Sequence, residues 1–357
     1  MSSTLGKNIE VSIYGESHGV GVGVVLNGLP SGFKVDLDLI NQYLYRRSTG
    51  RDNTMSARKE LDKVEILSGV YNGYTTGTPL SMLIYNTDQR SKDYDKMQTL
   101  ARPSHADYTG YVRYKGFNDI RGGGHFSGRL TTPLVMAGAV CMSILNQLGI
   151  DIVASIKSIG EIECKSIFSD IENLDFISFK NKDFPSVDKC EDIKEYINEK
   201  RLAQDSVGGY IECAIKGLKA GVGSPMFYGV ENVISNAIFG IPAIKGIEFG
   251  EDCELVGSIY NDNIYVENNS IKTKTNHDGG INGGITNGMP ILFKVKVKPT
   301  PSIMRVQETI NYKTLENSEI QIVGRHDPCV VVRAVPCVEC VTAIAILDLV
   351  MEGKKYE

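Results

Sequence analysis

The sequence predicts an α+β protein built on antiparallel sheets, and three observations favour that class. Segments with the apolar alternation of strands come in clusters, as at residues 9–26 and 64–85, and do not alternate strictly with helices. Two predicted helices, at residues 128–148 and 338–351, are apolar around most of their circumference, as buried helices are. No Gly-x-Gly-x-x-Gly or phosphate-loop motif is present, which disfavours the Rossmann and P-loop classes.

The composition is that of an ordinary globular protein, with 357 residues, 42% hydrophobic and 23% charged. The 38 Lys and Arg residues against 43 Asp and Glu residues give a net charge of −5, which disfavours non-specific binding to nucleic acid. No internal repeat, low-complexity tract or flexible linker divides the chain. We therefore expect a single domain, residues 1–357.

The first predicted elements are a hairpin and a helix. Residues 9–26 contain two β-branched runs that flank a polar turn at residues 15–19. Asp36 is placed to cap a helix that ends near Arg47. The polar, aperiodic segment 48–60 predicts an exposed, mobile loop.

Strands are expected next at residues 64–71 and 80–85, followed by the apolar helix at 128–148. The small residues at 137–139 indicate that this helix packs closely against another backbone.

The second half of the chain shows the same two periodicities. The predicted elements are strands at 151–158, 207–215 and 291–298 and helices at 188–204 and 338–351. In the clearest strand, 291–298, the odd-numbered apolar residues face inward and the lysines face water. The charged stretch 168–192 is expected to be an insertion or a surface excursion.

Three features indicate a cytoplasmic protein. The N-terminal segment has no apolar run behind a basic one, so no secretory signal is expected. The longest mostly apolar stretch, residues 134–145, is shorter than the roughly 20 residues that span a bilayer. Eight scattered cysteines lack the dense spacing of a secreted disulfide scaffold and favour reduced thiols.

The placement of histidines is the strongest signal for chemistry. Four of the five lie in polar turns that contain Gly or Arg: His18, His105, His125 and His326. Three of these four have an Arg within four residues. A guanidinium binds carboxylate or phosphate with a rigid fork, and a nearby imidazole gives or takes a proton near neutral pH. The pattern favours an anionic substrate that undergoes proton transfer, whereas a single histidine of this kind would more often only satisfy a loop carbonyl.

Two other clusters have competing interpretations. A glycine-rich turn at residues 279–284, after His277, could approach a phosphate or a flat ring, but a plain loop is the better interpretation. Residues His326, Cys329, Cys337 and Cys340 have a spacing that could hold zinc. Buried free cysteine is the more common explanation, because Cys329 and Cys340 lie in apolar runs.

Six motifs occur in the order found in one enzyme family. They are Gly-Glu-Ser-His-Gly at 15–19, Asn-Thr-Asp-Gln-Arg-Ser-x-Asp-Tyr at 86–94, Arg-Pro-x-His-Ala-Asp at 102–107, Asp-x-Arg-Gly-Gly-Gly at 119–124, Lys-Pro-Thr at 298–300 and Gly-Arg-His-Asp-Pro-Cys at 324–329. Through nearly its whole length the chain resembles chorismate synthase.

This resemblance implies a lyase that converts 5-enolpyruvylshikimate 3-phosphate to chorismate, by 1,4-anti elimination of phosphate and the C6 proton, in the shikimate pathway of aromatic amino acid biosynthesis. Reduced FMN would take part without net redox change, and NADPH or an external flavin reductase would supply the reduced flavin. The implied fold is one domain with helices sandwiched between two antiparallel four-stranded sheets, assembled as a homotetramer.

The resemblance also implies roles for three residues. His18 would protonate or stabilise the departing phosphate, and His105 would keep the reduced flavin in its charge state near N1. Asp327 would relay the proton from flavin N5. General acid–base help of this kind is worth about 10²- to 10⁴-fold per group.

Binding residues carry over from the same motifs. The expected substrate clamps are Arg47, Arg102, Arg129 and Arg325. The expected FMN contacts are His125, Phe126, Ser127, Asn236, Ala237, Gly284, Pro299, Thr300, Pro301, Ser302, Ile303 and Arg325.

The chain departs from the family pattern at a few positions. His125 and Phe126 stand where many members have Arg and Ser, and Pro301 stands where Ser is frequent. Arg51 is out of its usual register, with Asn53 at the expected place. Two alternatives stay open: an enzyme that acts on another phosphorylated carboxylate without flavin, and an interaction protein stabilised by zinc.

Overall fold

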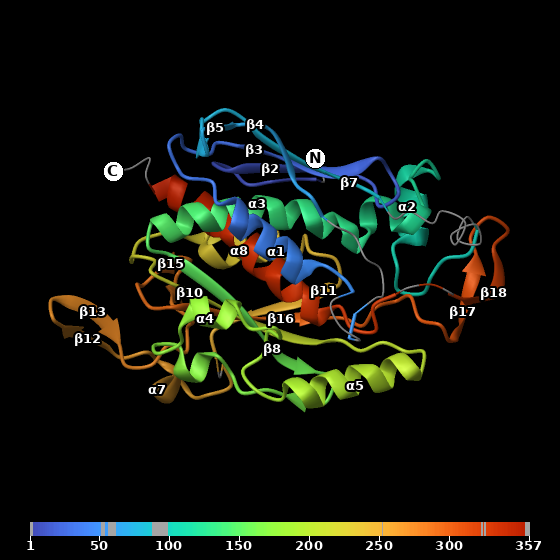
Figure 1. Ribbon diagram of the computed structural model, residues 1–357. Helices are drawn as coiled ribbons and strands as arrows, with labels where there is room; N and C mark the ends of the chain where they lie inside the picture. The colour runs from blue at the N-terminus through green and yellow to red at the C-terminus, as the bar shows by residue number, and fades with distance from the viewer. Residues whose placement is uncertain are drawn as a thin grey trace.

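In the computed structural model, two antiparallel sheets lie on either side of a layer of helices (Figure 1). The described residues are 3–50, 54–55, 62–87, 99–251, 253–322, 324 and 326–353. Every strand pair within these residues is antiparallel, which confirms the predicted sheet type. The mobile loop predicted at 48–60 lies mostly outside the described residues.

The first sheet has the strand order β1-β2-β3-β7-β4. Its strands are β1 (Thr4–Leu5), β2 (Glu10–Gly15), β3 (Gly21–Asn27), β7 (Leu80–Tyr85) and β4 (Glu65–Ser68). The predicted hairpin is present as β2 and β3, with Gly15 opposite Val22. The predicted strand at 64–71 is split, because residues 70–71 leave the sheet as β5 (Val70–Tyr71) and pair with β6 (Tyr74–Thr75).

The second sheet has the order β11-β16-β10-β8-β9. Its strands are β11 (Ile244–Phe249), β16 (Ile291–Val297), β10 (Gly209–Lys216), β8 (Asp151–Ile159) and β9 (Ile162–Glu163). Each main sheet therefore has five strands and not the four expected from the family, since a two-residue strand is added at one edge of each.

The helical layer contains α1 (Leu37–Arg47), α3 (Thr131–Gln147), α6 (Val230–Ile238) and α8 (Val331–Gly353). Asp36 caps α1 as predicted, accepting a hydrogen bond from the backbone N–H of Leu39. α8 begins at Val331, well before the predicted residue 338, and runs through Pro336. Because proline disfavours a helix interior, the local sequence carries no signal for a helix that continues through it.

The two longest helical stretches form the centre of the core. Gly128–Gln147 and Val331–Gly353 are long and apolar enough to cross a membrane, but 94% and 89% of their most apolar windows are buried inside the protein. These helices contact one another and the inner faces of both sheets, as core helices do.

The stretch 168–192, predicted as an insertion or a surface excursion, lies over the outer face of the second sheet and covers part of it. It forms η4 (Phe168–Asp170) and α4 (Phe176–Lys180) and leads into α5 (Cys190–Leu202). Three of its four phenylalanines, Phe168, Phe176 and Phe179, pack with Val153, Ala214 and Leu292 on the outer face of the second sheet and form a small second core. Leu292 is therefore buried on the face of β16 that the alternation assigned to water.

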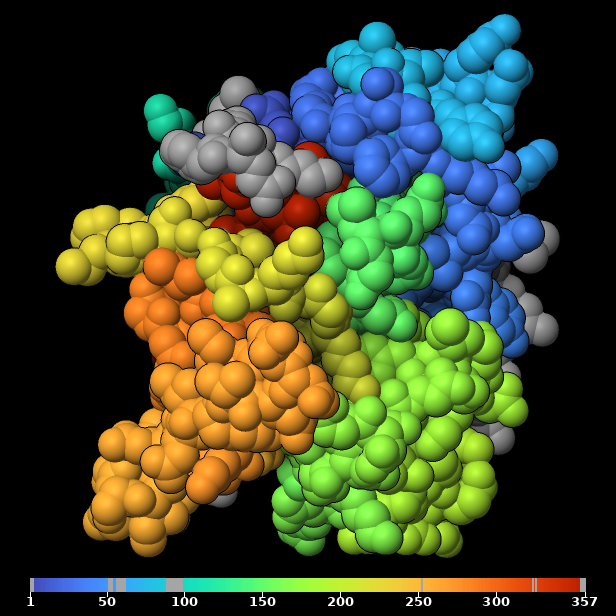
Figure 2. All heavy atoms as spheres, turned by 90° about the vertical axis from the view of Figure 1, so that its left-hand side faces the viewer, coloured from blue at the N-terminus to red at the C-terminus, as the bar shows by residue number. Residues whose placement is uncertain are grey.

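The other described elements are short. They are α2 (Asp107–Tyr114), η2 (Arg121–Phe126), η3 (Gly128–Leu130), η5 (Met226–Tyr228), α7 (Gly257–Tyr260), β12 (Ile264–Glu267), β13 (Ser270–Thr273), β14 (Ile281–Asn282), β15 (Ile285–Thr286), β17 (Val306–Asn311) and β18 (Glu316–Gln321). The β12–β13 hairpin projects from the body of the protein in both overall views (Figures 1 and 2).

Candidate active site

The turn between β2 and β3 holds His18 against a glycine-rich segment. A Cβ atom on Gly122 would lie 2.1 Å from Nδ1 of His18, so the imidazole rests directly on that backbone. Gly122 has φ +61°, a conformation that L side chains disfavour. The ring is enclosed here, since His18 is only 4% exposed.

The next glycine contacts a second histidine. A Cβ on Gly123 would lie 3.2 Å from Cε1 and 3.3 Å from Nε2 of His105. The structure thus brings His18 and His105, 87 positions apart in the sequence (105 − 18), to adjoining glycines of one turn. Side chains at Gly122 and Gly123 would overlap or crowd both rings, which explains why this turn needs glycine.

Asp107, at the start of α2, organises His105 and Arg102. Its Oδ1 lies 2.7 Å from both His105 Nδ1 and Arg102 Nη2, and its Oδ2 accepts from Arg102 Nε at 2.8 Å. The backbone N–H of Arg102 also donates to Oδ2, at 2.9 Å. An ionised carboxylate only accepts hydrogen bonds, so the shorter contact, to Asp107, assigns the proton of His105 to Nδ1 and the lone pair to Nε2. Arg102 Nη2, which can only donate, lies 3.0 Å from the same Nδ1 atom.

Electrostatics keep His105 neutral. Burial lowers the pKa of His105 below 6.5, and the charges of Arg102 and Lys298 act in the same direction, against the effect of Asp107. Burial alone would raise the pKa of Asp107, but hydrogen bonds from Arg102 and His105 outweigh it and lower that pKa far below its usual range. Near neutral pH the cluster therefore has an ionised Asp107 beside a neutral His105.

Two other predicted clamp residues meet at a carboxylate that sequence reasoning missed. Asp62 Oδ2 lies 2.6 Å from Arg47 Nη2, and Asp62 Oδ1 lies 2.6 Å from Arg129 Nη1. All three side chains are 4% or 5% exposed. Burial alone would raise the pKa of Asp62, but the charges of both arginines and the hydrogen bonds from them outweigh it and lower that pKa.

Asp327 precedes α8 and pairs with a residue of that helix. Its Oδ2 lies 3.2 Å from Nε of Arg333, which sequence reasoning also missed. A Cβ on Gly128 would lie 3.4 Å from Arg333 Nη2, so Arg333 reaches from Asp327 to the start of η3. Arg325 lies outside the described residues, and its predicted role stays a prediction.

The side chains at 125–127 contact the N-terminal segment, helix α2 and the turn that carries His18. His125 Nδ1 donates to the carbonyl of Gly15 at 2.9 Å, which leaves Nε2 to accept from the Ser3 hydroxyl at 2.8 Å. The Phe126 ring packs beside Tyr114 with centroids 6.2 Å apart. The Ser127 hydroxyl lies 3.2 Å from that of Ser17, in the turn that carries His18.

The turn 299–303 lies beside the His105 cluster. Ser302 Oγ accepts a hydrogen bond from Arg102 Nη1 at 3.3 Å. The buried hydroxyl of Thr300 has no hydrogen-bond partner among the described residues. An orphaned buried hydroxyl is costly unless a ligand engages it, so this turn fits the bound group that was expected there.

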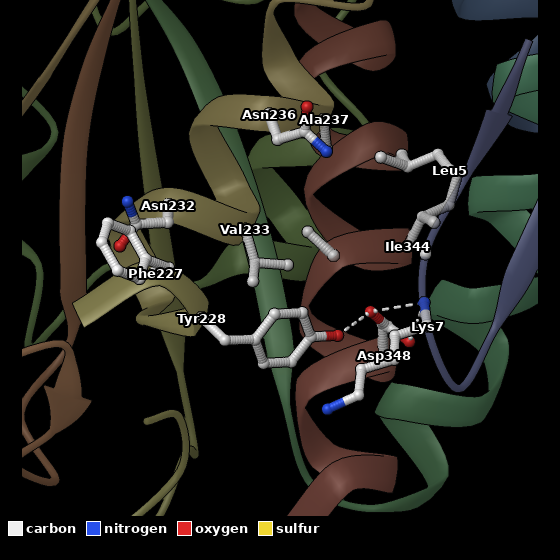
Figure 3. Close-up of a pocket in the computed structure, with 12 residues that line it drawn as sticks. Leu5, Lys7, Phe227, Tyr228, Asn232, Val233, Asn236, Ala237, Ile344 and Asp348 are labelled. Atoms are coloured by element: carbon white, nitrogen blue, oxygen red, sulfur yellow. Dashed lines mark hydrogen bonds between the residues drawn. The ribbon is translucent and has the colours of Figure 1, made fainter. Parts of the chain in front are cut away.

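Asn236 and Ala237 lie on α6 and line a separate cavity of about 230 Å³ between α6, α8 and the N-terminal strand (Figure 3). Lys7, Tyr228 and Asp348 also line it, and the Tyr228 hydroxyl donates to Asp348 Oδ2 at 2.5 Å. None of the described catalytic or clamp residues lines this cavity.

Gly284 supports the same helix. Its carbonyl accepts from the backbone N–H of Val230 at the start of α6, and a Cβ on Gly284 would lie 2.6 Å from the Ser224 carbonyl. Gly284 is therefore placed near α6 and not at the histidines.

The four residues of the zinc alternative do not gather into a metal site. Within the described part of the chain, no group of three or more His, Cys, Asp or Glu side chains is arranged to hold a metal ion. Cys329, Cys337 and Cys340 are buried in the core, and burial raises the pKa of Cys329 to about 12. A thiol with so high a pKa resists forming the thiolate that zinc binds.

Buried guanidinium and imidazole groups on a glycine-rich frame have the chemistry that suits a small, multiply anionic molecule, beside groups able to move protons. A family model described as chorismate synthase matches residues 9–351. The chain belongs to the chorismate synthase family.

Individual relatives agree over nearly their full lengths. A protein of Dehalococcoides mccartyi named chorismate synthase is 40% identical, over 99% of this chain and 98% of its own. One of Lachnospira eligens with the same name is 43% identical, over 98% and 95%. A crystal structure of chorismate synthase superposes with a TM-score of 0.76 at 30% identity, covering 98% of this chain and 93% of that one.

Proposed function

We propose that the chain converts 5-enolpyruvylshikimate 3-phosphate to chorismate with reduced FMN. In this 1,4-anti elimination the C–O bond to phosphate and the C6–H bond break, a ring double bond forms, and phosphate and a proton leave. The observation that carries the proposal is the placement of His18 and His105 on adjoining glycines, with Arg102 and Asp107 behind His105.

Two groups of arginines suit the charges of this substrate, which has two carboxylates and a phosphate. Arg47 and Arg129 are buried together at Asp62, and Arg102 is held at Asp107. A guanidinium in a dry site binds carboxylate or phosphate more strongly than one in water. On a protein of net charge −5, such local clusters are needed to attract an anion.

The histidines suit the proton transfers. Neutral His105 has its proton fixed on Nδ1 by Asp107, so Nε2 is the atom that would accept or share a proton with a bound group. We propose that His18 protonates or stabilises the departing phosphate. We propose that Asp327, whose carboxylate pairs with Arg333, takes up a proton and passes it on.

The proposed cofactor site includes the orphaned Thr300 hydroxyl and the turn 299–303 beside Arg102. When bound there, reduced flavin would supply electron density to the breaking bond to phosphate and an acceptor for the C6 hydrogen, without net redox change. The chain's task is then to orient the two molecules and exclude water. Asn236 and Ala237 lie on α6 and Gly284 lies at its start, and their contact with flavin remains a proposal.

We also propose a cellular location, an oligomeric state and a source of reduced flavin. A cytoplasmic location in the shikimate pathway is supported by the eight cysteines, all free. A homotetramer of single-domain chains is supported by exposed apolar residues on the projecting hairpin, where Ile264, Val266 and Ile271 are 68% to 73% exposed. NADPH or an external flavin reductase would supply reduced FMN.

An anaerobic assay tests the proposal. Purified protein is mixed with FMN and 5-enolpyruvylshikimate 3-phosphate, with or without dithionite, and chorismate absorbance and phosphate release are followed. We expect product only with reduced flavin, and NADPH in place of dithionite then shows whether the chain reduces its own cofactor. Product without any reductant would favour a flavin-independent enzyme, and no product would show that the site serves another anion.

A further inference from the structure

We propose that Asp62 and Asn86 are positioning residues that join the Arg47 and Arg129 guanidiniums to the His18 turn in one hydrogen-bonded frame. This inference rests on the proposed function, because it assigns Arg47 and Arg129 to the substrate anion. The anion is a phosphate or carboxylate group of the substrate.

Asp62 supplies the charge that allows two arginines to be buried together. It accepts from Arg47 Nη2 and Arg129 Nη1 through different oxygens, both at 2.6 Å. Arg47 comes from the last turn of α1 and Arg129 from η3, so the carboxylate joins two separate elements. Removing one partner of a buried ion pair leaves an uncompensated buried charge. Without Asp62, the two cations would also repel one another and leave this geometry.

Asn86, just after β7, connects Arg129 to the His18 turn through hydrogen bonds. Its Oδ1 accepts from Arg129 Nε at 3.0 Å. Its Nδ2 faces three carbonyls of the His18 turn, those of Glu16, Ser17 and Gly19, at 3.0, 3.3 and 2.9 Å. Only an amide has both the acceptor for the arginine and the donors for the carbonyls, so an Asp or Leu of similar size cannot replace it.

Arg47 retains a donor for a ligand. Its Nε is buried and has no hydrogen-bond partner among the described residues, although the side chain is 5% exposed. A buried guanidinium N–H without a partner carries a desolvation penalty that a bound anion would relieve. Asp62 therefore holds this guanidinium by one terminal nitrogen and leaves Nε for the substrate.

The test separates positioning from stability with four variants, one of which is the conservative change Asp62→Glu. Asp62→Asn keeps the shape of the side chain, but it removes the negative charge and turns an amide N–H group toward one arginine, which can only donate. Asn86→Asp removes the N–H donors that bind the carbonyls of the His18 turn. The matched control is Glu339→Gln, because Glu339 pairs with Arg46, the neighbour of Arg47, at 2.5 Å and 0% exposure inside the core. Calorimetry measures the Kd of inorganic phosphate and of 5-enolpyruvylshikimate 3-phosphate with oxidised FMN present, and unfolding scans give Tm.

We expect Asp62→Asn to raise both Kd values by at least about tenfold, because it removes the partner of two buried guanidiniums, and Asp62→Glu to restore part of the affinity. Asn86→Asp should lower kcat by about tenfold or more with a smaller change in Kd, because it disturbs the His18 turn. Glu339→Gln should lower Tm and leave both Kd values within about twofold of the original protein.

An unchanged Kd in folded Asp62→Asn would overturn the inference, and so would a lower Kd, which would make Asp62 a competitor of the anion. If Asp62→Asn does not fold, Asp62→Glu decides: a Kd unchanged there despite the longer side chain counts against positioning. Phosphate affinity is measurable whether or not the protein makes chorismate, so failure of this inference and failure of the proposed function are distinguishable.

Discussion

Gly138 on α3 lies against the backbone of Cys340 on α8. A Cβ on Gly138 would be 2.2 Å from the Cys340 carbonyl oxygen and 2.3 Å from its Cβ. The small residues at 137–139 predicted such an approach, and the structure confirms it and supplies the partner. The two buried helices at the centre of the core therefore cross at backbone contact.

Gly138→Ala should lower the free energy of unfolding by about 1–3 kcal/mol, the usual cost of an extra methyl group in a packed core. Alanine stabilises a helix by about 1 kcal/mol relative to glycine. The steric cost of the new Cβ must therefore be larger than this stabilisation for the variant to be less stable. Urea unfolding measures the change. The control is Gly353→Ala at the end of α8, where nothing lies within 4 Å of the new Cβ and stability should be unchanged or slightly higher. Equal effects would contradict the close crossing.

Gly122→Ala should reduce turnover by at least about 10²-fold, because its Cβ would overlap the ring of His18 at 2.1 Å. A positive φ alone costs an alanine roughly 1–2 kcal/mol in stability. Gly73→Ala separates the two effects, since Gly73 has φ +81° and nothing within 4 Å. We expect both variants to lose stability and only Gly122→Ala to lose turnover, measured as initial rates of chorismate formation.

His105→Ala and Asp327→Asn should each lower kcat by about 10²- to 10⁴-fold, the usual worth of a general acid or base. Tm should fall modestly in both variants, because each change removes a partner of a largely buried polar pair, and kcat is therefore compared at a temperature where both variants are folded. Asp151→Asn serves as a control, because Asp151 at the start of β8 pairs with Lys180 of α4 and not with a site residue. This variant should have an unchanged kcat. Normal turnover in both site variants would remove these residues from the proposed machinery.

The lowered pKa of His105 gives stability a defined dependence on pH. The unfolded chain takes up a proton at this residue as the pH falls through 6.5, and the folded chain does so only at lower pH. The unfolded state binds more protons in that window, so the contribution of His105 is fully present above pH 6.5 and is lost below it. Urea unfolding measures the free energy of unfolding at pH 7.5 and at pH 5.5. The decrease between these two values should be smaller for His105→Gln than for the original protein. An equal loss would show that other groups cause the acid sensitivity.

Local sequence patterns determined much of the fold. Alternation located β2, β3, β7, β8, β10 and β16, and the cap at Asp36 located α1. The patterns failed where tertiary packing overrides local preference. α8 continues through Pro336 because the core encloses it, and residues 168–192 look charged in sequence although their phenylalanines cover a sheet.

In the candidate site, too, some features follow from the local sequence and others only from tertiary packing. The sequence by itself determined which motifs carry Arg and His, and it predicted from them a site for an anion and proton transfer, because this prediction depends on residue type and short spacing. Only the tertiary structure decided that Gly122 and Gly123 join His18 to His105, and that Asp62 lies between Arg47 and Arg129. These contacts link segments far apart in the chain, and their geometry depends on how two sheets and the helices between them pack, which no local pattern records.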